Sequence, residues 1–397
     1  MDLDLDAQDL EFRQDVRAFL AANLPGDLRR KMINRDHLIK DDIVRWQRIL
    51  NARGWATPNW PVEYGGTGWT PAQRYIFQEE MALARAPETL SFNVSMIGHV
   101  LCHFGTAEQK SRFLAPTANL DIWWCQGFSE PGAGSDLASL KSTATREGDE
   151  WVLDGQKIWT TQAQYADWMF GLFRTDNSGK KQQGISFLIF PMTTPGITVR
   201  PIRTLDGEAD LNEVFFDSVR IPAANIVGEV GGGWDVAKNL LGSERSGIAR
   251  VGLSKERLLQ LRKLERQLTA NGVLTLFEQQ RLAAKLAEVE VDLRALELTQ
   301  LRVVSADAHG GGAASAASVL KVRGTEIQQR MSELILELAG PAGLARPSSD
   351  RRSADPELDD DWIGSAAPFY LNMRKPSIFG GANEIQKNIV AKTMLGL

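Results

Sequence analysis

The sequence predicts an α+β protein of several domains, because helical and strand-like patterns occupy different parts of the chain. Apolar residues recur at helical spacing up to about residue 120, short apolar runs separated by turns fill about 122–216, and long helical patterns follow from about 234. A chain of 397 residues is also too long for one ordinary hydrophobic core. We therefore expect an N-terminal α-helical domain over 1–121, a middle β domain over 122–227 and a C-terminal helix-bundle domain over 228–397.

The N-terminal region carries the expected signals of helix starts. The apolar residues from Phe12 to Leu20 share one helical face. Thr70-Pro71 predicts an N-cap followed by a first-turn proline. A further helix should cover about 90–104, and Thr106 with Gln109 fits a capping box for the next one.

The middle region has no helix-length pattern between its apolar runs. Glu147–Asp149 and Asp154-Gly155 are typical of hairpin turns, so an antiparallel barrel or sandwich is favoured over a doubly wound parallel sheet. The predicted strands are Trp123–Phe128, Ser142–Arg146, Glu150–Leu153, Lys157–Thr160, Trp168–Arg174, Ile185–Phe190, Ile197–Ile202 and Val214–Phe216.

The C-terminal region reads as long helices over about 234–270, 275–308 and 313–339, with a last pair on either side of Gly380-Gly381. Helices of this length favour an antiparallel bundle. The charged, proline-containing segment 347–361 is expected to be a mobile loop.

One of these helices carries apolar residues on more than one face, which favours a homodimer or homotetramer. The main stripe can instead face the intrachain bundle. It consists of Leu282, Leu286, Val289, Leu293 and Leu296, while Val291 and Leu298 lie off it.

Composition narrows the class of protein. The chain is 43% hydrophobic and 24% charged, as soluble globular proteins are. A net charge of −5 without a basic patch argues against nucleic-acid binding, and no apolar run is long enough for a membrane span. Cys102 and Cys125 are expected as buried free thiols in the reducing cytoplasm. Four scattered histidines predict no metal site.

The stretch from Cys125 to Thr161 carries the strongest functional signal. It contains Gly-Phe-Ser-Glu-Pro-Gly-Ala-Gly-Ser-Asp at 127–136, where glycines allow a ligand close approach to the backbone. Trp159 and Thr161 then offer a stacking ring and a polar edge. Taken alone, the glycine-rich part fits an ordinary surface turn equally well, and Trp159 alone fits a core residue equally well. Together, in this order and spacing, they predict a site for a planar heterocycle.

This stretch resembles the acyl-CoA dehydrogenase family, flavoproteins that oxidise the Cα–Cβ bond of acyl-CoA thioesters. The resemblance runs from Trp55 to the final helix. It implies FAD as cofactor, an acyl-CoA substrate and electron-transfer flavoprotein as electron acceptor. The cofactor-binding residues that it implies are Gln126, Phe128, Ser129, Gly134, Ser135, Trp159, Thr160, Thr161, Glu337, Gly340, Ala382 and Glu384. Ser135 is implied to touch the CoA moiety as well.

The chain departs from the family pattern where many members grip the FAD pyrophosphate. Their Arg-x-x-Phe-Gly motif aligns here with Thr269 to Gly272, so the grip must be weaker or come from elsewhere, with Arg281 a candidate. The family's Gln-x-x-Gly-Gly segment becomes Glu337-Leu-Ala-Gly340-Pro341.

A second departure concerns the catalytic base. Most members place a glutamate in the final loop, where this chain has Gly380-Gly381. In the long-chain and isovaleryl branches the base stands on another helix immediately before an arginine, and this chain has Glu244-Arg245 there. The resemblance thus implies Glu244 as the base, and Arg245, Gly380 and Gly381 as further substrate-binding residues.

Two alternatives of other classes stay open. The chain also resembles the large subunit of pimeloyl-CoA dehydrogenase, whose Gly-Gly-Ala-Asn-Glu-Ile-Gln ending it shares at 380–386. This resemblance implies a small partner subunit. The alternative function is that of a non-catalytic, flavin-binding subunit of a hetero-oligomer. An acyl-CoA oxidase or desulfinase on the same fold is the third class, which oxygen consumption without an added acceptor would identify.

Overall fold

The structure, a computed structural model, describes residues 6–243, 249–308, 314–344 and 361–397. The chain divides into two compact units. The first unit comprises Met1–Leu38, Trp69–Glu88 and Arg245–Leu397, and the second comprises Ile39–Gly68 and Thr89–Glu244. Each unit is therefore built from segments that are distant in sequence. The predicted domain boundaries after residues 121 and 227 stay predictions.

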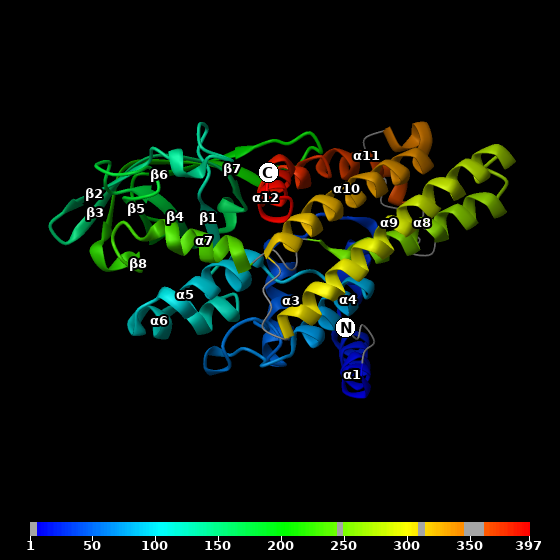
Figure 1. Ribbon diagram of the computed structural model, residues 1–397, viewed down its shortest axis with the longest axis horizontal. Helices are drawn as coiled ribbons and strands as arrows, with labels where there is room; N and C mark the ends of the chain where they lie inside the picture. The colour runs from blue at the N-terminus through cyan, green and yellow to red at the C-terminus, as the bar shows by residue number, and fades with distance from the viewer. Residues whose placement is uncertain (1–5, 244–248, 309–313, 345–360) are drawn as a thin grey trace. The chain divides into compact units, whose positions relative to one another are not determined.

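The second unit consists of a β sheet together with helices that precede and follow its strands along the chain (Figure 1). Its helices are α3 (Lys40–Ala52), the π-helical turn η2 (Phe92–Ile97), α5 (Gly98–Phe104), α6 (Ala107–Ala118) and α7 (Gly233–Ser243). Its strands are β1 (Trp124–Gly127), β2 (Thr143–Glu147), β3 (Glu150–Thr161), β4 (Trp168–Arg174), β5 (Ile185–Pro191), β6 (Ile197–Ile202), β7 (Leu211–Pro222) and β8 (Ile226–Val227).

The sheet has the strand order β6-β7-β3-β2-β4-β5-β8, with β1 beside β4. Five of these pairings are antiparallel, which confirms the predicted β domain. Two are parallel, β1 with β4 and β2 with β4, and the second consists of the single register Thr143 to Arg174. The short strand β8 was not predicted because it has only two residues. The full length of β7 was not predicted because Asp217 and Ser218, the latter at φ 51°, interrupt its apolar pattern.

The predicted hairpin turn at Asp154-Gly155 is wrong. Strand β3 continues through it from Glu150 to Thr161, with an irregular register between Leu153 and Gly155. Gly155 has φ +134°, and a Cβ there would collide with Ser142. The glycine therefore serves a bulge and a close approach to β2, rather than a reversal of the chain.

Strands β4 and β5 are buried on both faces, and alternate side chains enter two different cores. Phe170, with Leu172 and Phe187, packs in the core that also holds residues of α5, α6 and α7. Met169 and Phe173 pack in a second core formed by strands. The sheet that carries the candidate site is therefore fixed from two sides.

The first unit is helical in the part of it that the structure describes. In Figure 1 the long helices α8, α9 and α10 run beside one another. Its helices are α1 (Ala7–Asn23), α2 (Gly26–Asn34), α4 (Pro71–Leu83), α8 (Val251–Ala270), α9 (Leu276–Ala308), α10 (Ala314–Ala339), α11 (Asp361–Asn372) and α12 (Asn383–Met394).

The single helix predicted over 234–270 is interrupted. Helix α8 begins at Val251, directly after Arg250, which lies in the left-handed region at φ 49°. A left-handed residue cannot continue a right-handed helix. The predicted mobile loop at 347–361 lies, apart from Asp361, outside the described residues.

The structure agrees with the sequence predictions for two helix starts and for the two cysteines. Thr70 accepts a hydrogen bond from the Gln73 amide at 3.1 Å, and the Thr106 capping box is formed. Both cysteines are free and buried, as predicted. In the described part of the chain, none of the helices has the length and apolar character that a membrane crossing requires.

The apolar stripe of α9 faces the interior of its own unit, in agreement with one of the two interpretations. All five stripe residues are at most 5% exposed and belong to the helical core. Val291 and Leu298, off the stripe, are 70% and 37% exposed.

The oligomer stays a prediction. Val291 and Leu298 are exposed apolar residues of α9 that an interface between subunits would bury. We expect light scattering to give at least twice the monomer mass of 43.9 kDa. A monomer mass alone would reject it.

Candidate active site

The glycine-rich loop that follows β1 begins in the core and then turns outward. Phe128 is 6% exposed, and its ring meets Phe170 and Phe187 edge to face at 5.9 and 6.2 Å. Glu130 and Ala133 exchange two backbone hydrogen bonds of 3.0 Å, which closes a tight turn. The loop is therefore anchored at its start and held in shape at its tip.

The outer part of this loop is open to a ligand. A Cβ added at Gly132 or Gly134 would meet nothing within 4 Å. Gly134 and Ser135 are exposed, and among the described residues no acceptor pairs with their N–H groups. Unpaired loop amides of this kind donate to an anion or to the polar edge of a heterocycle.

Trp159 lies beside this loop in an unusual conformation. Its φ is +60°, in the left-handed region, and its side chain is 55% exposed. Ile158 and Trp159 lie opposite the single residue Glu213 of β7, so Trp159 stands in a β-bulge. A large residue held at positive φ is strained, and such strain clusters at functional sites.

The strand residues around Trp159 connect it to the loop. The Ile158 N–H donates to the Ser129 carbonyl at 2.9 Å, which brings the two halves of the predicted motif together. Thr161 is half-buried. Thr160 is buried, and its hydroxyl has no partner among the described residues, while Asn212 donates to its carbonyl at 3.1 Å.

Gln126 is half-buried in β1, opposite Phe170 of β4 in the register.

Lys157 and Glu130 form an ion pair beneath the loop. Sequence reasoning gave Lys157 no role, although a lysine in a strand-like run beside Trp159 was a usable signal.

The first unit holds the remaining predicted residues. Gly380 and Gly381 have φ +63° and +89°, so both occupy the left-handed region that suits glycine. Ala382 precedes α12 as its N-cap position, and Glu384 is exposed in the first turn. The Gly-Gly turn is thus presented at the N-terminus of a helix, where backbone N–H groups are available.

A buried polar layer fixes the start of α12. The Lys321 ammonium donates to the Asn383 side-chain oxygen at 2.8 Å, and Asn383 donates to Thr325 at 3.1 Å. Burial lowers the pKa of Lys321 to about 8, against the charge of Glu384, which raises it. Sequence reasoning missed this layer because its partners lie about 60 residues apart.

The candidate residues for the adenine half of the cofactor have other partners in this structure. Arg281 forms an ion pair with Glu337, and Lys285 approaches the other oxygen of that carboxylate at 2.6 Å. Gly340 ends α10 at φ +57°.

The predicted base Glu244 and its neighbour Arg245 lie outside the described residues. The helix that leads to them, α7, is packed inward: Val236, Ala237 and Leu240 are at most 2% exposed.

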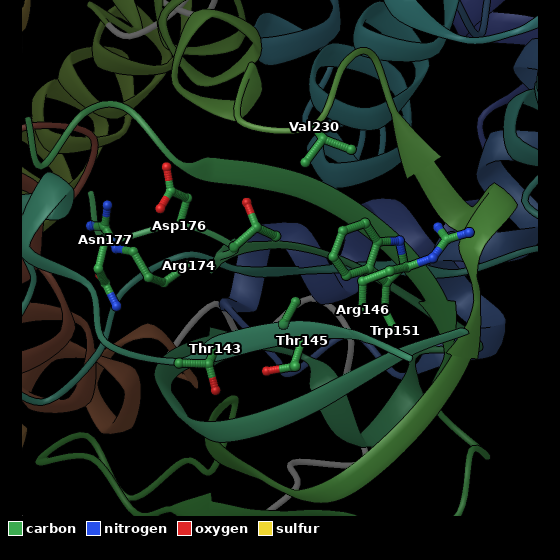
Figure 2. A pocket seen from close by; sticks show the side chains of 10 residues that line it. Thr143, Thr145, Arg146, Trp151, Arg174, Asp176, Asn177 and Val230 are labelled. Carbon is green, nitrogen blue, oxygen red and sulfur yellow. The ribbon is translucent and has the colours of Figure 1, made fainter. Parts of the chain in front are cut away.

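The second unit also contains a groove of about 580 Å³ beside the short β2–β4 pairing. Figure 2 shows Val230, Trp151 and Thr145 around it. None of the predicted cofactor or substrate residues lines this groove.

Helical segments, a middle sheet that bears this loop and further helical segments follow one another along the chain, which is the order of the acyl-CoA dehydrogenase fold. Three family models match: "Acyl-CoA dehydrogenase, N-terminal domain" over 6–121, "middle domain" over 125–219 and "C-terminal domain" over 231–395. The chain belongs to the acyl-CoA dehydrogenase family, whose members are oxidoreductases and are generally FAD-dependent.

Individual relatives agree with this. "Acyl-CoA dehydrogenase IpdE1" of Mycobacterium tuberculosis is 35% identical over 392 residues, covering 98% of this chain and 97% of that one. The solved structure "Tcur3481-Tcur3483 steroid ACAD" matches with a TM-score of 0.86 at 31% identity, over 100% and 99% of the two chains. The "ChsE4-ChsE5 complex from Mycobacterium tuberculosis" matches with a TM-score of 0.84 at 31% identity, over the same shares.

Proposed function

We propose that this chain is an FAD-dependent dehydrogenase that forms a double bond between Cα and Cβ of an acyl-CoA thioester. The observation that carries the proposal is the exposed, left-handed Trp159, which follows the strand residue bonded to the loop that carries the open N–H groups of Gly134 and Ser135. FAD, when bound, supplies the acceptor for the hydride from Cβ, which no amino-acid side chain can provide. Electron-transfer flavoprotein is the proposed recipient of the electrons.

The residues of the second unit fit the flavin ring. Trp159 offers a face for stacking, and Phe128 closes the buried side of the loop. Ser129, Gly134 and Ser135 offer hydroxyls and amides, and Thr161 a hydroxyl beyond the bulge. The positions implied for the rest of the cofactor are Gln126, Thr160, Glu337, Gly340, Ala382 and Glu384.

The proton from Cα is proposed to go to Glu244. Donors that meet the thioester oxygen lower the barrier to this transfer, because negative charge develops on that oxygen. The backbone N–H groups at Gly380 and Gly381 are proposed for this role, and Arg245 for binding the CoA side of the substrate.

The acyl group is proposed to carry a steroid ring. The support is a solved relative named as a steroid ACAD, which is 31% identical and matches the full length of this chain.

An anaerobic screen tests the function. Acyl-CoA thioesters with straight-chain and steroid-ring acyl groups are added to the FAD-loaded protein, and flavin bleaching at about 450 nm is followed. We expect bleaching with at least one thioester, and fastest with the steroid-ring class. A flavin that binds but is bleached by none of them would contradict catalysis by this chain.

A second candidate function is a flavin-binding subunit without catalysis in a hetero-oligomer. Gly380 at the usual base position favours it, and the names of two solved relatives, Tcur3481-Tcur3483 and ChsE4-ChsE5, each join two components. Bleaching that appears only after a small partner subunit is added would identify this case.

Replacement of Trp159 by alanine is expected to raise the Kd for FAD about 10- to 100-fold, because stacking and area burial by a tryptophan are both lost. Fluorescence titration with FAD measures this. Trp159→Gly is the matched control, because glycine removes the ring but tolerates the positive φ. Equal losses in both variants would assign the effect to the ring. An unchanged Kd would make Trp159 a structural residue only.

A further inference from the structure

Lys157 is an ammonium-bearing side chain placed in an apolar interior. It is 0% exposed, and its neighbours in the strand core include Phe173, whose ring centre lies 5.0 Å from its Nζ. Its Nζ lies 2.7 Å from the Glu130 carboxylate. A buried charge is costly unless it is paired, and many buried pairs can be replaced by apolar residues without loss of stability. The pair therefore calls for an explanation other than stability.

The Glu130 carboxylate joins three separate segments. It accepts hydrogen bonds from the Lys141 amide at 2.6 Å and the Ser142 amide at 2.9 Å, where the chain enters β2. It also accepts the bond from Lys157 of β3. The loop, the start of β2 and the middle of β3 are thus held together by one buried group.

Successive loop residues are fastened to successive strand residues. Lys157 donates to the Phe128 carbonyl at 3.3 Å and to the Glu130 side chain at 2.7 Å, while the intervening Ser129 carbonyl accepts from Ile158. Residues 128–130 are therefore tied to 157–158 at every step. Trp159 comes next along the strand, at its strained φ of +60°.

The electrostatics agree with a charged pair. Burial raises the pKa of Glu130, but Lys157 and the two amides outweigh it and hold that pKa below its usual range. Burial lowers the pKa of Lys157 to about 8, against the attraction of Glu130. Each group thus favours the charged form of the other.

We propose that the buried Lys157–Glu130 pair is the positioning element that sets the loop 128–135 and Trp159 in the geometry of a flavin site. Its role in cofactor binding rests on the proposed function. The pair acts through the loop and the strand and does not itself touch the cofactor. The pair fixes the position of β3 just before the bulge. Trp159, at its strained φ, keeps this conformation only if the residues around it are held in place.

The test uses the double variant Lys157→Met/Glu130→Gln, which removes both charges at once, because Lys157→Met alone leaves an unpaired buried carboxylate. Two quantities are measured on the full-length protein: the Kd for FAD, and hydrogen exchange of peptides spanning 128–135 and 157–161 without FAD. We expect a folded protein whose Kd is raised at least about tenfold and whose exchange in these peptides is at least about tenfold faster.

Arg220→Met is the matched control. Arg220 pairs with Glu147 on the surface of the same sheet, both about half exposed, and its loss should change neither quantity. A folded double variant with wild-type Kd and wild-type exchange would overturn the proposal. If the wild-type protein fails to bind FAD, the proposed function falls, while faster exchange in the double variant still supports the positioning role and unchanged exchange rejects it. If the double variant does not fold, Glu130→Gln, which removes the charge of the carboxylate but keeps a hydrogen-bonding side chain of nearly the same shape, decides: a folded protein with a weakened Kd and faster exchange supports the proposal, and an unaltered Kd and exchange contradict it.

Discussion

Replacing Glu244 with glutamine is expected to slow flavin reduction by acyl-CoA about 10²- to 10⁴-fold, the usual contribution of a positioned general base. Glutamine is nearly isosteric but cannot take the Cα proton. FAD binding and acyl-CoA binding should be retained, because neither needs the proton transfer. Stopped-flow absorbance under anaerobic conditions measures the rate, and fluorescence titration measures the two affinities.

The final loop offers no carboxylate at the usual base position. Gly380 has no side chain, and at φ +63° a glutamate there would be strained by about 1–2 kcal/mol. Catalysis as proposed therefore requires another carboxylate as the base. Helix α7 leads directly to Glu244, and its inner face is buried through Leu240.

Two other glutamates serve as comparison. Glu130 is held ionised by three donors, so Glu130→Gln should affect the loop rather than the proton transfer. Glu384 is exposed at the start of α12. If Glu244→Gln reduced its flavin at the wild-type rate, Glu384 would become the candidate base.

Local signals predicted much of the fold. Thr70-Pro71 and Thr106 gave correct helix starts because an N-cap depends on residues within one turn. Runs such as Trp168–Arg174 were found with their observed bounds because both faces of that strand are buried. Errors arose where tertiary contacts decide: Gly155 serves a bulge, and Arg250 interrupts a helical pattern.

The candidate site divides in the same way. The sequence identified the loop and Trp159 because both lie within one motif. It did not identify Lys157 as the partner of Glu130, since the two are separated by 27 positions and only the fold brings them to 2.7 Å. Asn383 with Lys321 is a similar case, 62 positions apart. Such pairs carry no periodicity and no composition signal.

Another set of buried charges joins four helices of the first unit. Lys255 of α8 contacts Glu79 of α4 at 2.5 Å and also pairs with Glu297 of α9. Arg13 of α1 reaches Glu79 at 2.9 Å. The carboxylates of Glu79 and Glu297 are both less than 10% exposed. Their charges are therefore compensated by protein groups and hardly by water.

Replacing Lys255 with methionine is expected to lower the free energy of unfolding by about 1.5–3 kcal/mol, because two buried carboxylates lose their shared cation while each keeps one arginine partner. Urea unfolding followed by circular dichroism measures this. Arg250→Met is the matched control: it breaks the pair with Glu88, whose side chains are 41% and 64% exposed, and should cost at most about 1 kcal/mol. Equal costs in the two variants would contradict the buried network.

The pH dependence of stability follows from the same network. Burial raises the pKa of Glu297, but Lys255 and Arg294 outweigh it and lower that pKa below its usual value. Its contribution is therefore complete above the unfolded pKa of about 4.3 and is lost as the pH falls through the lower folded pKa. Burial lowers the pKa of Lys255, yet Glu297 and Glu79 raise it overall, so its contribution is complete below about 10.4 and is lost only above that. In Lys255→Met the loss of stability on acidification should begin at a higher pH than in the wild type, since the carboxylate pKa rises without its cation. The free energies of unfolding of the wild type and Lys255→Met are compared from pH 7 to pH 3. A difference between them that stays constant over this range would contradict this assignment.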